Sequence, residues 1–176
     1  MKRLLLFRHA KAVGQASKSG DRGRPLNERG RADAPKMAVA MQHAGYLPDL
    51  VFCSPATRTV ETWENAAPEL DEKPELSFVD ALYLASPKTI AQIVRAAPSR
   101  SNTLLVLGHN PGLEEFAQAA VRRPQSDRER DRLESLKNKF PTAALAVIDF
   151  DVNDWNDVAI GSGALVDFIR PKQLNG

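Results

Sequence analysis

Cysteine is almost absent from this chain: Cys53 is the only one among 176 residues, which excludes an internal disulfide. A single thiol suits a reducing compartment, so we expect a cytoplasmic protein.

Long apolar runs are also lacking, since none approaches the ~18 residues that a membrane-spanning helix needs. The apolar residues 4–7 are too few for a signal peptide, and Arg8 and His9 interrupt the stretch. We therefore expect no membrane partner.

An excess of one charge sign is missing as well. The chain has 24 basic and 22 acidic residues, and a net charge of +2 is too small to indicate a nucleic-acid partner. In the most charged stretch, residues 122–139, acidic side chains are interleaved with basic ones. Ser126 and Glu129 have the spacing of a capping box, and Leu133 and Leu136 fall on one helical face. This pattern predicts a solvated amphipathic helix, so we expect no nucleic-acid partner.

Strand and helix patterns alternate along the chain. Short apolar runs predict strands at residues 2–7, 50–53, 76–79, 103–107, 144–150, 158–160 and 165–169. Capping residues and the positions of proline predict helices at residues 28–44, 55–67, 87–97, 111–122 and 126–139. Residues 11–26 predict a loop, and Ser54 is the expected cap of the second helix. Pro35 predicts a kink in the first helix, or a restart near Asp33.

This alternation predicts an α/β fold in a single domain, residues 1–176. We expect a three-layer sandwich with a mostly parallel central sheet flanked by helices. With 43% hydrophobic residues, a chain of this length can bury a substantial core.

Three of the apolar runs end in residues suited to phosphate chemistry. The first run ends in Arg8 and His9, the second leads to Arg58, and the third to His109. Ligands of open α/β sheets bind outside the carboxyl ends of the strands. We therefore expect these four side chains to meet in one crevice.

The chemistry of the four side chains fits phosphoryl transfer. A histidine can attack phosphorus through one ring nitrogen while a hydrogen bond holds the other. Arg8 and Arg58 offer planar forks of donors to phosphoryl oxygens, and His109 can bind the same oxygens as imidazolium. Taken singly, each would be read as an ordinary surface or turn residue, and only their joint placement favours a site. The remaining histidine, His43, is predicted to be a favourable cation at a helix C-terminus.

Residues 6–12 (LFRHAKA) resemble the Arg-His-Gly signature of the histidine phosphatase superfamily. Residues 53–62 (CSPATRTVET) and 106–112 (VLGHNPG) resemble its two other motifs. Within the superfamily the chain is most similar to the SixA branch of protein phosphohistidine phosphatases, on the evidence of residues 24–30, 81–85 and 140–146. The resemblance covers residues 4–150.

The resemblance implies a phosphoglycerate mutase-like fold and no cofactor. It implies that His9 is phosphorylated during turnover and that Arg8, Arg58 and His109 bind the phosphoryl group. Ala10 departs from the pattern because it replaces the usual glycine.

A second departure is the lack of a clear match to the acid that larger members use as proton donor. Asp80 and Asp21 are candidates by position only. Without a strong acid, the enzyme should favour leaving groups that depart easily, such as the imidazole of phosphohistidine.

The sequence thus predicts a metal-independent phosphatase that acts on phosphohistidine in a phosphorylated protein, with inorganic phosphate as product and inhibitor. A small-molecule phosphomonoesterase on the same scaffold is an alternative, and so is a non-catalytic phosphate-binding regulatory module. A metal hydrolase with His9 and His109 as ligands is disfavoured, because no His-x-x-x-His or Cys-x-x-Cys spacing occurs.

Overall fold

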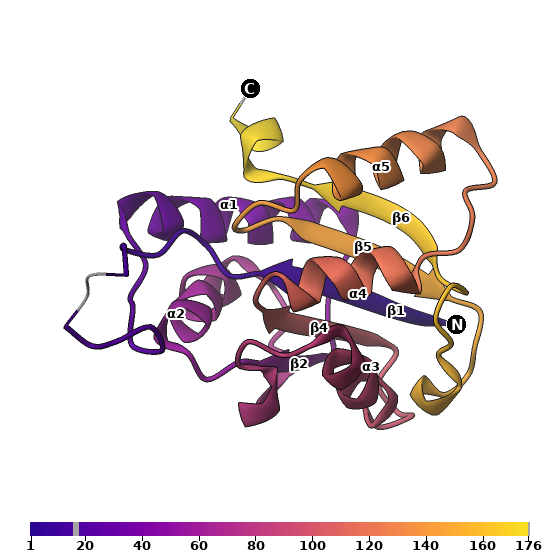
Figure 1. The fold of residues 1–176 in the computed structure, drawn as a ribbon, viewed down its shortest axis with the longest axis horizontal. Coiled ribbons are helices and arrows are strands. Elements are labelled where there is room, and N and C mark those ends of the chain that lie inside the picture. Colours follow the sequence, from indigo (N-terminus) through magenta and orange to yellow (C-terminus); the bar gives the residue numbers. More distant parts are fainter. Residues whose placement is uncertain (16–17, 176) are drawn as a thin grey trace.

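Six strands form one mixed sheet through the middle of the protein, seen in a computed structural model that describes residues 1–15 and 18–175 (Figure 1). The strands are β1 (Lys2–Arg8), β2 (Leu50–Cys53), β3 (Glu75–Phe78), β4 (Thr103–Gly108), β5 (Leu145–Phe150) and β6 (Ala164–Ile169). Their order across the sheet is β3-β2-β4-β1-β5-β6. The strands from β3 to β1 pair in parallel, and β5 is antiparallel to both its neighbours. The predicted mostly parallel sheet is confirmed.

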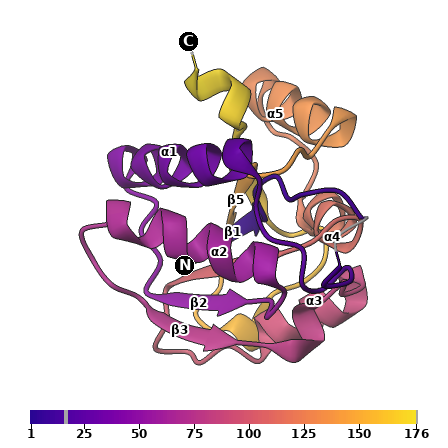
Figure 2. The same ribbon diagram turned by 90° about the vertical axis from the view of Figure 1, so that its left-hand side faces the viewer.

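Helices cover both faces of the sheet and complete three layers (Figure 2). They are α1 (Glu28–Ala44), α2 (Thr57–Ala66), α3 (Pro87–Arg95), α4 (Gly112–Ala120) and α5 (Asp127–Asn138). Short 3-10 helices lie at Ala67–Glu69, Asp80–Leu82, Trp155–Asp157 and Pro171–Leu174. Within the described residues, none of the helices combines the length and the apolar character needed to cross a membrane.

Two apolar clusters, one on each face of the sheet, hold the layers together. Alternate side chains of a strand point to opposite faces, so Leu5 packs towards α1 and α2, whereas Leu4 and Leu6 pack towards α3, α4 and α5. Burial of this apolar surface stabilises the sandwich by roughly 25 cal/mol for each Å² removed from water.

Three helices begin or end at the capping residues that the sequence predicts. Asn27 caps α1 by accepting the N–H of Gly30 at 2.9 Å, and Gly45 ends that helix with a φ of 71°. Ser86 and Ser126 cap α3 and α5 through their hydroxyl groups. These predicted caps are confirmed.

The predicted restart of α1 near Asp33 is wrong, because the helix continues through Pro35. Pro35 removes one backbone hydrogen bond, but Ala34, Met37 and Ala38 are fully buried against the sheet on either side of it. We attribute the continuity of the helix to this packing.

Two further expectations need correction. Helix α2 begins at Thr57 rather than at Pro55, and Ser54 does not cap it. Residues 158–160 are not a strand, because the N–H of Val158 closes a 3-10 turn onto the carbonyl of Trp155. The Val158 carbonyl accepts a hydrogen bond from Arg95 instead of a ladder partner.

The register of the sheet brings three strand ends to the same level. Arg8 lies opposite Gly108, and Cys53 lies opposite Leu107. The residues that follow β1, β2 and β4 therefore share one edge.

The loop after β1 returns to α1 at this edge. Ala12 bridges Leu26, and the carbonyl of Lys11 accepts the N–H of Asn27. A Cβ at Gly30 would lie 2.1 Å from the Lys11 carbonyl oxygen, so only glycine permits this close approach.

Candidate active site

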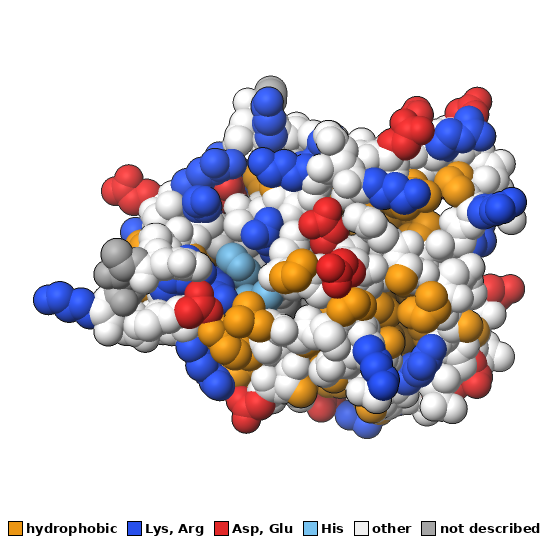
Figure 3. Space-filling view, viewed as in Figure 1, with side chains coloured by type: hydrophobic (Ala, Val, Ile, Leu, Met, Phe, Trp, Pro, Cys, Tyr) orange, Lys and Arg blue, Asp and Glu red, His pale blue; other side chains and the backbone are white. Residues whose placement is uncertain are grey.

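A cavity of about 580 Å³ opens at the shared carboxyl ends of β1, β2 and β4. The four residues predicted to meet all line it: Arg8, His9, Arg58 and His109. In the space-filling view, histidine side chains are visible in a hollow between blue cationic side chains (Figure 3). The topology therefore brings together the residues that the sequence placed at separate strand ends.

His9 presents one ring nitrogen with a free lone pair. Its Nδ1 lies 2.8 Å from the carbonyl oxygen of Ala10, which can only accept, so Nδ1 carries the proton and Nε2 does not. The side chain is buried, and burial lowers the pKa of His9 to about 3, with a further contribution from Arg58. His9 is therefore neutral at neutral pH, as attack on phosphorus requires.

Ala10 fits the position that a glycine usually fills in the related motif. Its backbone does not have a positive φ, and its N–H donates to Thr62 Oγ1 at 2.9 Å. Thr62 Oγ1 in turn donates to the carbonyl oxygen of Arg58 at 2.6 Å. A single hydroxyl thus links the turn after His9 to the first turn of α2.

Arg8 and Arg58 are each held in place by hydrogen bonds from some of their N–H groups, and each has one further N–H group with no partner among the described residues. Arg8 Nη1 donates to the carbonyl oxygen of Phe140 at 2.8 Å. Arg58 donates from Nη1 to the carbonyl oxygen of Asp21 at 2.7 Å and from Nη2 to Asp21 Oδ2 at 3.2 Å. The Nε atoms of both side chains are buried without a partner in the described part of the chain.

His109 lies beside His9, with 5.3 Å between the two ring centroids. Its Nε2 is 2.7 Å from Ser54 Oγ, and its Nδ1 is buried without a partner among the described residues. Burial lowers the pKa of His109 to about 3, with His9 and Arg58 adding to the shift. The ring is therefore neutral at neutral pH, whereas the sequence pattern suggested an imidazolium.

Asp21 lies in the cavity, but its contacts do not favour a role as proton donor. Its Oδ2 accepts from Tyr83 Oη at 2.5 Å and from Arg58, and its Oδ1 accepts from Arg24 Nε at 3.1 Å. The hydrogen bond from Tyr83 and the nearby Arg58 lower the pKa of Asp21 to about 2. The carboxyl group is thus ionised and carries no proton to give.

Asp80, the other candidate donor, is not part of the cavity lining. Its side chain is 89% exposed and pairs with Arg22 at 3.1 Å. The structure therefore does not bring Asp80 together with the four core residues.

Sequence reasoning missed polar side chains that contact the core residues or Asp21. Ser54 contacts His109 and Thr62 contacts the backbone of Arg58, whereas Tyr83 and Arg24 hydrogen-bond to Asp21. The neighbouring motif residues gave a signal for Ser54 and Thr62, since both belong to the stretch that contains Arg58. Their partners come from other strands and loops, so the contacts depend on the order of strands in the sheet.

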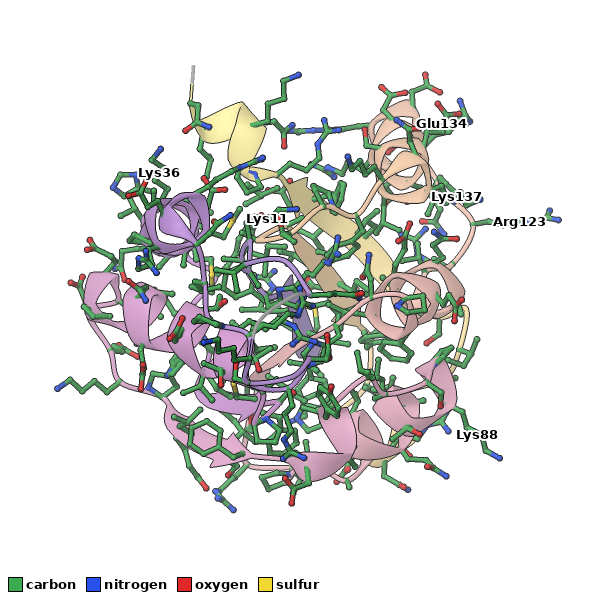
Figure 4. All side chains as sticks on the ribbon, turned by 60° about the vertical axis from the view of Figure 1, so that its left-hand side comes forward. Lys11, Lys36, Lys88, Arg123, Glu134 and Lys137 are labelled. Carbon is green, nitrogen blue, oxygen red and sulfur yellow. The ribbon has the colours of Figure 1, made fainter. Side chains whose placement is uncertain are left out.

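Lys11 adds a further cation at the outer part of the cavity. It lines the cavity and is exposed. In the view with side chains as sticks, Lys11 lies over the middle of the protein, whereas Lys88 and Arg123 extend from its periphery (Figure 4). Within the described residues, no three His, Cys, Asp or Glu side chains gather so that they could hold a metal ion.

Comparison with known proteins gives a consistent result. A family model described as the histidine phosphatase superfamily, branch 1, matches residues 4–82. The uncharacterized protein Rv1276c of Mycobacterium tuberculosis is 31% identical over 166 residues, which are 94% of this chain and 100% of that protein.

Two solved structures resemble the chain over almost its whole length. A protein of Agrobacterium tumefaciens assigned as a phosphohistidine phosphatase SixA is 30% identical, with a TM-score of 0.78 over 97% of this chain and 98% of that one. The protein assigned likewise in Nakamurella multipartitia is 29% identical, with a TM-score of 0.78 over 97% and 96%. The chain belongs to the histidine phosphatase superfamily, on its SixA-like side, and is a histidine-type phosphatase.

Proposed function

We propose that this phosphatase removes the phosphoryl group from phosphohistidine displayed on another protein, without a metal, through a phosphohistidine intermediate on His9. One observation carries the proposal. All buried side-chain nitrogens that lack a partner in the described part of the chain belong to residues lining the cavity beside His9. These nitrogens are Arg8 Nε, Arg58 Nε and His109 Nδ1.

Unpartnered buried donors are costly, at about 1–3 kcal/mol each. Two of these nitrogens are arginine N–H groups, and His109 Nδ1 is a third donor when the ring proton lies there. Around one cavity, next to a histidine with a free lone pair, they suit a ligand that only accepts hydrogen bonds and carries negative charge. A phosphoryl group has three acceptor oxygens and about two negative charges. Its binding would satisfy all three donors at once and place phosphorus near His9 Nε2.

In the proposed reaction, the Nε2 lone pair of His9 attacks phosphorus while the bond between phosphorus and the substrate imidazole breaks. The departing imidazole nitrogen takes a proton from water. A second water then attacks the phosphorus on His9, the bond to Nε2 breaks, and inorganic phosphate leaves. The lone pair returns to Nε2, and the proton lost by the attacking water balances the one taken earlier. Throughout, His9 Nδ1 keeps its proton and donates it in a hydrogen bond to the carbonyl oxygen of Ala10.

The leaving group decides the substrate class. Asp21 is ionised in the cavity and Asp80 lies outside it, so neither is placed to protonate a poor leaving group. An alkoxide needs such an acid, whereas an imidazole can take its proton from water. The volume of the cavity also exceeds that of a phosphoryl group and leaves room for the side chain that carries it.

The test is a comparison of kcat/KM at neutral pH for a phosphohistidine peptide, a phosphoserine peptide and p-nitrophenyl phosphate. We expect the phosphohistidine peptide to react far faster than the phosphoserine peptide, in the presence of EDTA and without added metal. His9→Ala should abolish turnover, and the exposed His43→Ala serves as the matched control. Equal or better values for the phosphoserine peptide would overturn the proposal and favour a phosphomonoesterase.

A further inference from the structure

Ser54 is a buried residue that contacts His109 from the neighbouring strand. It directly follows β2, which pairs with β4, the strand that leads to His109. Its Oγ lies 2.7 Å from His109 Nε2, and it also accepts the N–H of Ala56 at 3.4 Å. Ser54 is fully buried, and His109 is only 3% exposed, so water does not compete for this contact.

The position of the hydroxyl proton follows from counting donors. A serine hydroxyl has one proton to donate and two lone pairs. Because Oγ already accepts from Ala56, and the structure gives its proton no other acceptor among the described residues, donation to His109 Nε2 satisfies both groups. Nε2 is then the acceptor, and the ring proton of the neutral imidazole lies on Nδ1.

The other tautomer would be unfavourable at this site. With the proton on Nε2, Nδ1 could offer only a lone pair, which would repel the oxygens of a phosphoryl group bound beside it. Nδ1 is the ring nitrogen that is buried and lacks a partner in the part of the chain that the structure describes. Only the tautomer with a proton on Nδ1 makes the neutral ring a donor there.

We propose that Ser54 is a positioning residue that fixes the Nδ1–H tautomer of His109, so that Nδ1 donates to a phosphoryl oxygen during transfer. The two histidines then play complementary roles set by different neighbours. The Ala10 carbonyl holds the proton of His9 on Nδ1 and frees the Nε2 lone pair. The Ser54 hydroxyl occupies the Nε2 lone pair of His109 and keeps its proton on Nδ1.

The direct test is the nitrogen NMR spectrum of the full chain labelled with ¹⁵N-histidine at neutral pH. The chain has only three histidines, so His9→Gln, His43→Gln and His109→Gln assign the signals. We expect a protonated Nδ1 and an unprotonated Nε2 for His109 in the wild type. A wild-type proton on Nε2 would overturn the inference, whatever the substrate proves to be.

Two variants test the role of the hydroxyl itself. Ser54→Ala should shift the His109 signals towards the Nε2–H tautomer or a mixture, and Ser54→Thr should keep the wild-type pattern. Ser101→Ala is the matched control, because it removes another buried hydroxyl, one bonded to Asp49. Unchanged His109 signals in folded Ser54→Ala would also contradict the inference.

The kinetic consequence rests on the proposed function. We expect kcat for Ser54→Ala to fall by about 10- to 100-fold with a smaller change in KM, less than complete removal of a transition-state donor. Ser54→Thr should recover most of the loss. A changed tautomer with unchanged kcat on every phosphorylated substrate would mean that His109 does not donate in the transition state. The NMR result is independent of that outcome, so the two failures are distinguishable.

Discussion

Asp21 accepts two hydrogen bonds from the Arg58 guanidinium. Arg58 Nη1 donates to the backbone carbonyl oxygen of Asp21 at 2.7 Å, and Arg58 Nη2 donates to the Asp21 carboxylate at 3.2 Å. The Arg58 Nε atom, on the other side of the guanidinium, is buried and has no partner within residues 1–15 and 18–175. Asp21, a candidate proton donor by its position in the sequence, therefore has the geometry of a clamp that orients Arg58, the cation that we propose binds phosphate.

Asp21→Asn tests the clamp against the donor role. A clamp acts on phosphate binding, so kcat/KM should fall by a similar factor for a phosphohistidine peptide and for p-nitrophenyl phosphate. We expect roughly tenfold, or about 1.4 kcal/mol of transition-state stabilisation. A loss confined to substrates with poor leaving groups would restore Asp21 as the acid. Asp80→Asn changes an exposed carboxylate outside the cavity and is the control; it should leave kcat/KM unchanged for both substrates.

His9 is expected to carry the phosphoryl group during turnover. Rapid quenching with a phosphorylated substrate should yield an acid-labile phosphate that maps to His9, because its Nε2 has the free lone pair. The label should vanish in His9→Ala and persist in His43→Ala. Label on His109, or on no residue, would refute the assignment.

Arg8→Ala and Arg58→Ala should each weaken both inhibition by phosphate and turnover. Loss of one preorganised donor group costs about 2–4 kcal/mol of transition-state stabilisation. Arg58→Lys should not restore full activity, since an ammonium lacks the planar fork. Arg100→Ala, at an exposed arginine paired with Glu75, is the control. A tenfold smaller energetic loss at Arg8 or Arg58 would remove that residue from the binding set.

Chelation should leave activity intact. In the proposed site, the two arginines and His109 supply the donors for the phosphoryl oxygens, and no third metal-binding side chain joins the two histidines among the described residues. Activity on a phosphohistidine peptide is measured before and after dialysis against EDTA. Loss on dialysis with recovery on adding zinc or magnesium would require a different mechanism.

Acid should destabilise the fold through the two cavity histidines. The pKa of both is about 3 in the folded protein, below the ordinary value of 6.5. Between those values the unfolded chain binds protons that the folded protein does not, so the free energy of unfolding falls as the pH falls. The slope is about 1.4 kcal/mol per pH unit for each histidine.

Urea unfolding at pH values between 6 and 4 measures this slope. His109→Gln should remove the part of the slope that His109 contributes. An equal slope in His109→Gln and wild type would show that His109 is not held neutral.

Much of the fold was predictable because it follows from local chemistry. Asn27 and Gly45 mark the ends of α1, and Ser86 and Ser126 mark the starts of two other helices. The strand predicted at residues 158–160 is wrong because Val158 is apolar for another reason: it is buried in a turn and does not pair in the sheet.

The four core residues of the site were predictable from strand ends alone, since parallel strands share an edge. The side chains that hydrogen-bond to these four residues could not be predicted from the sequence. Ser54 meets His109 only because β2 lies beside β4. Asp21 meets Tyr83 across 62 positions of the chain, a separation that no local pattern reveals.

The Thr62 hydroxyl couples the turn that follows His9 to helix α2, which carries Arg58. It accepts from the backbone after His9 and donates to the backbone of Arg58, and it is itself fully buried. A shift of α2 would therefore strain the hydrogen bond between Thr62 and the turn after His9. Under the proposed function, a phosphoryl group that enters the cavity meets donors already held in place, so little conformational entropy is lost on binding. More of the binding energy then remains available to stabilise the transition state.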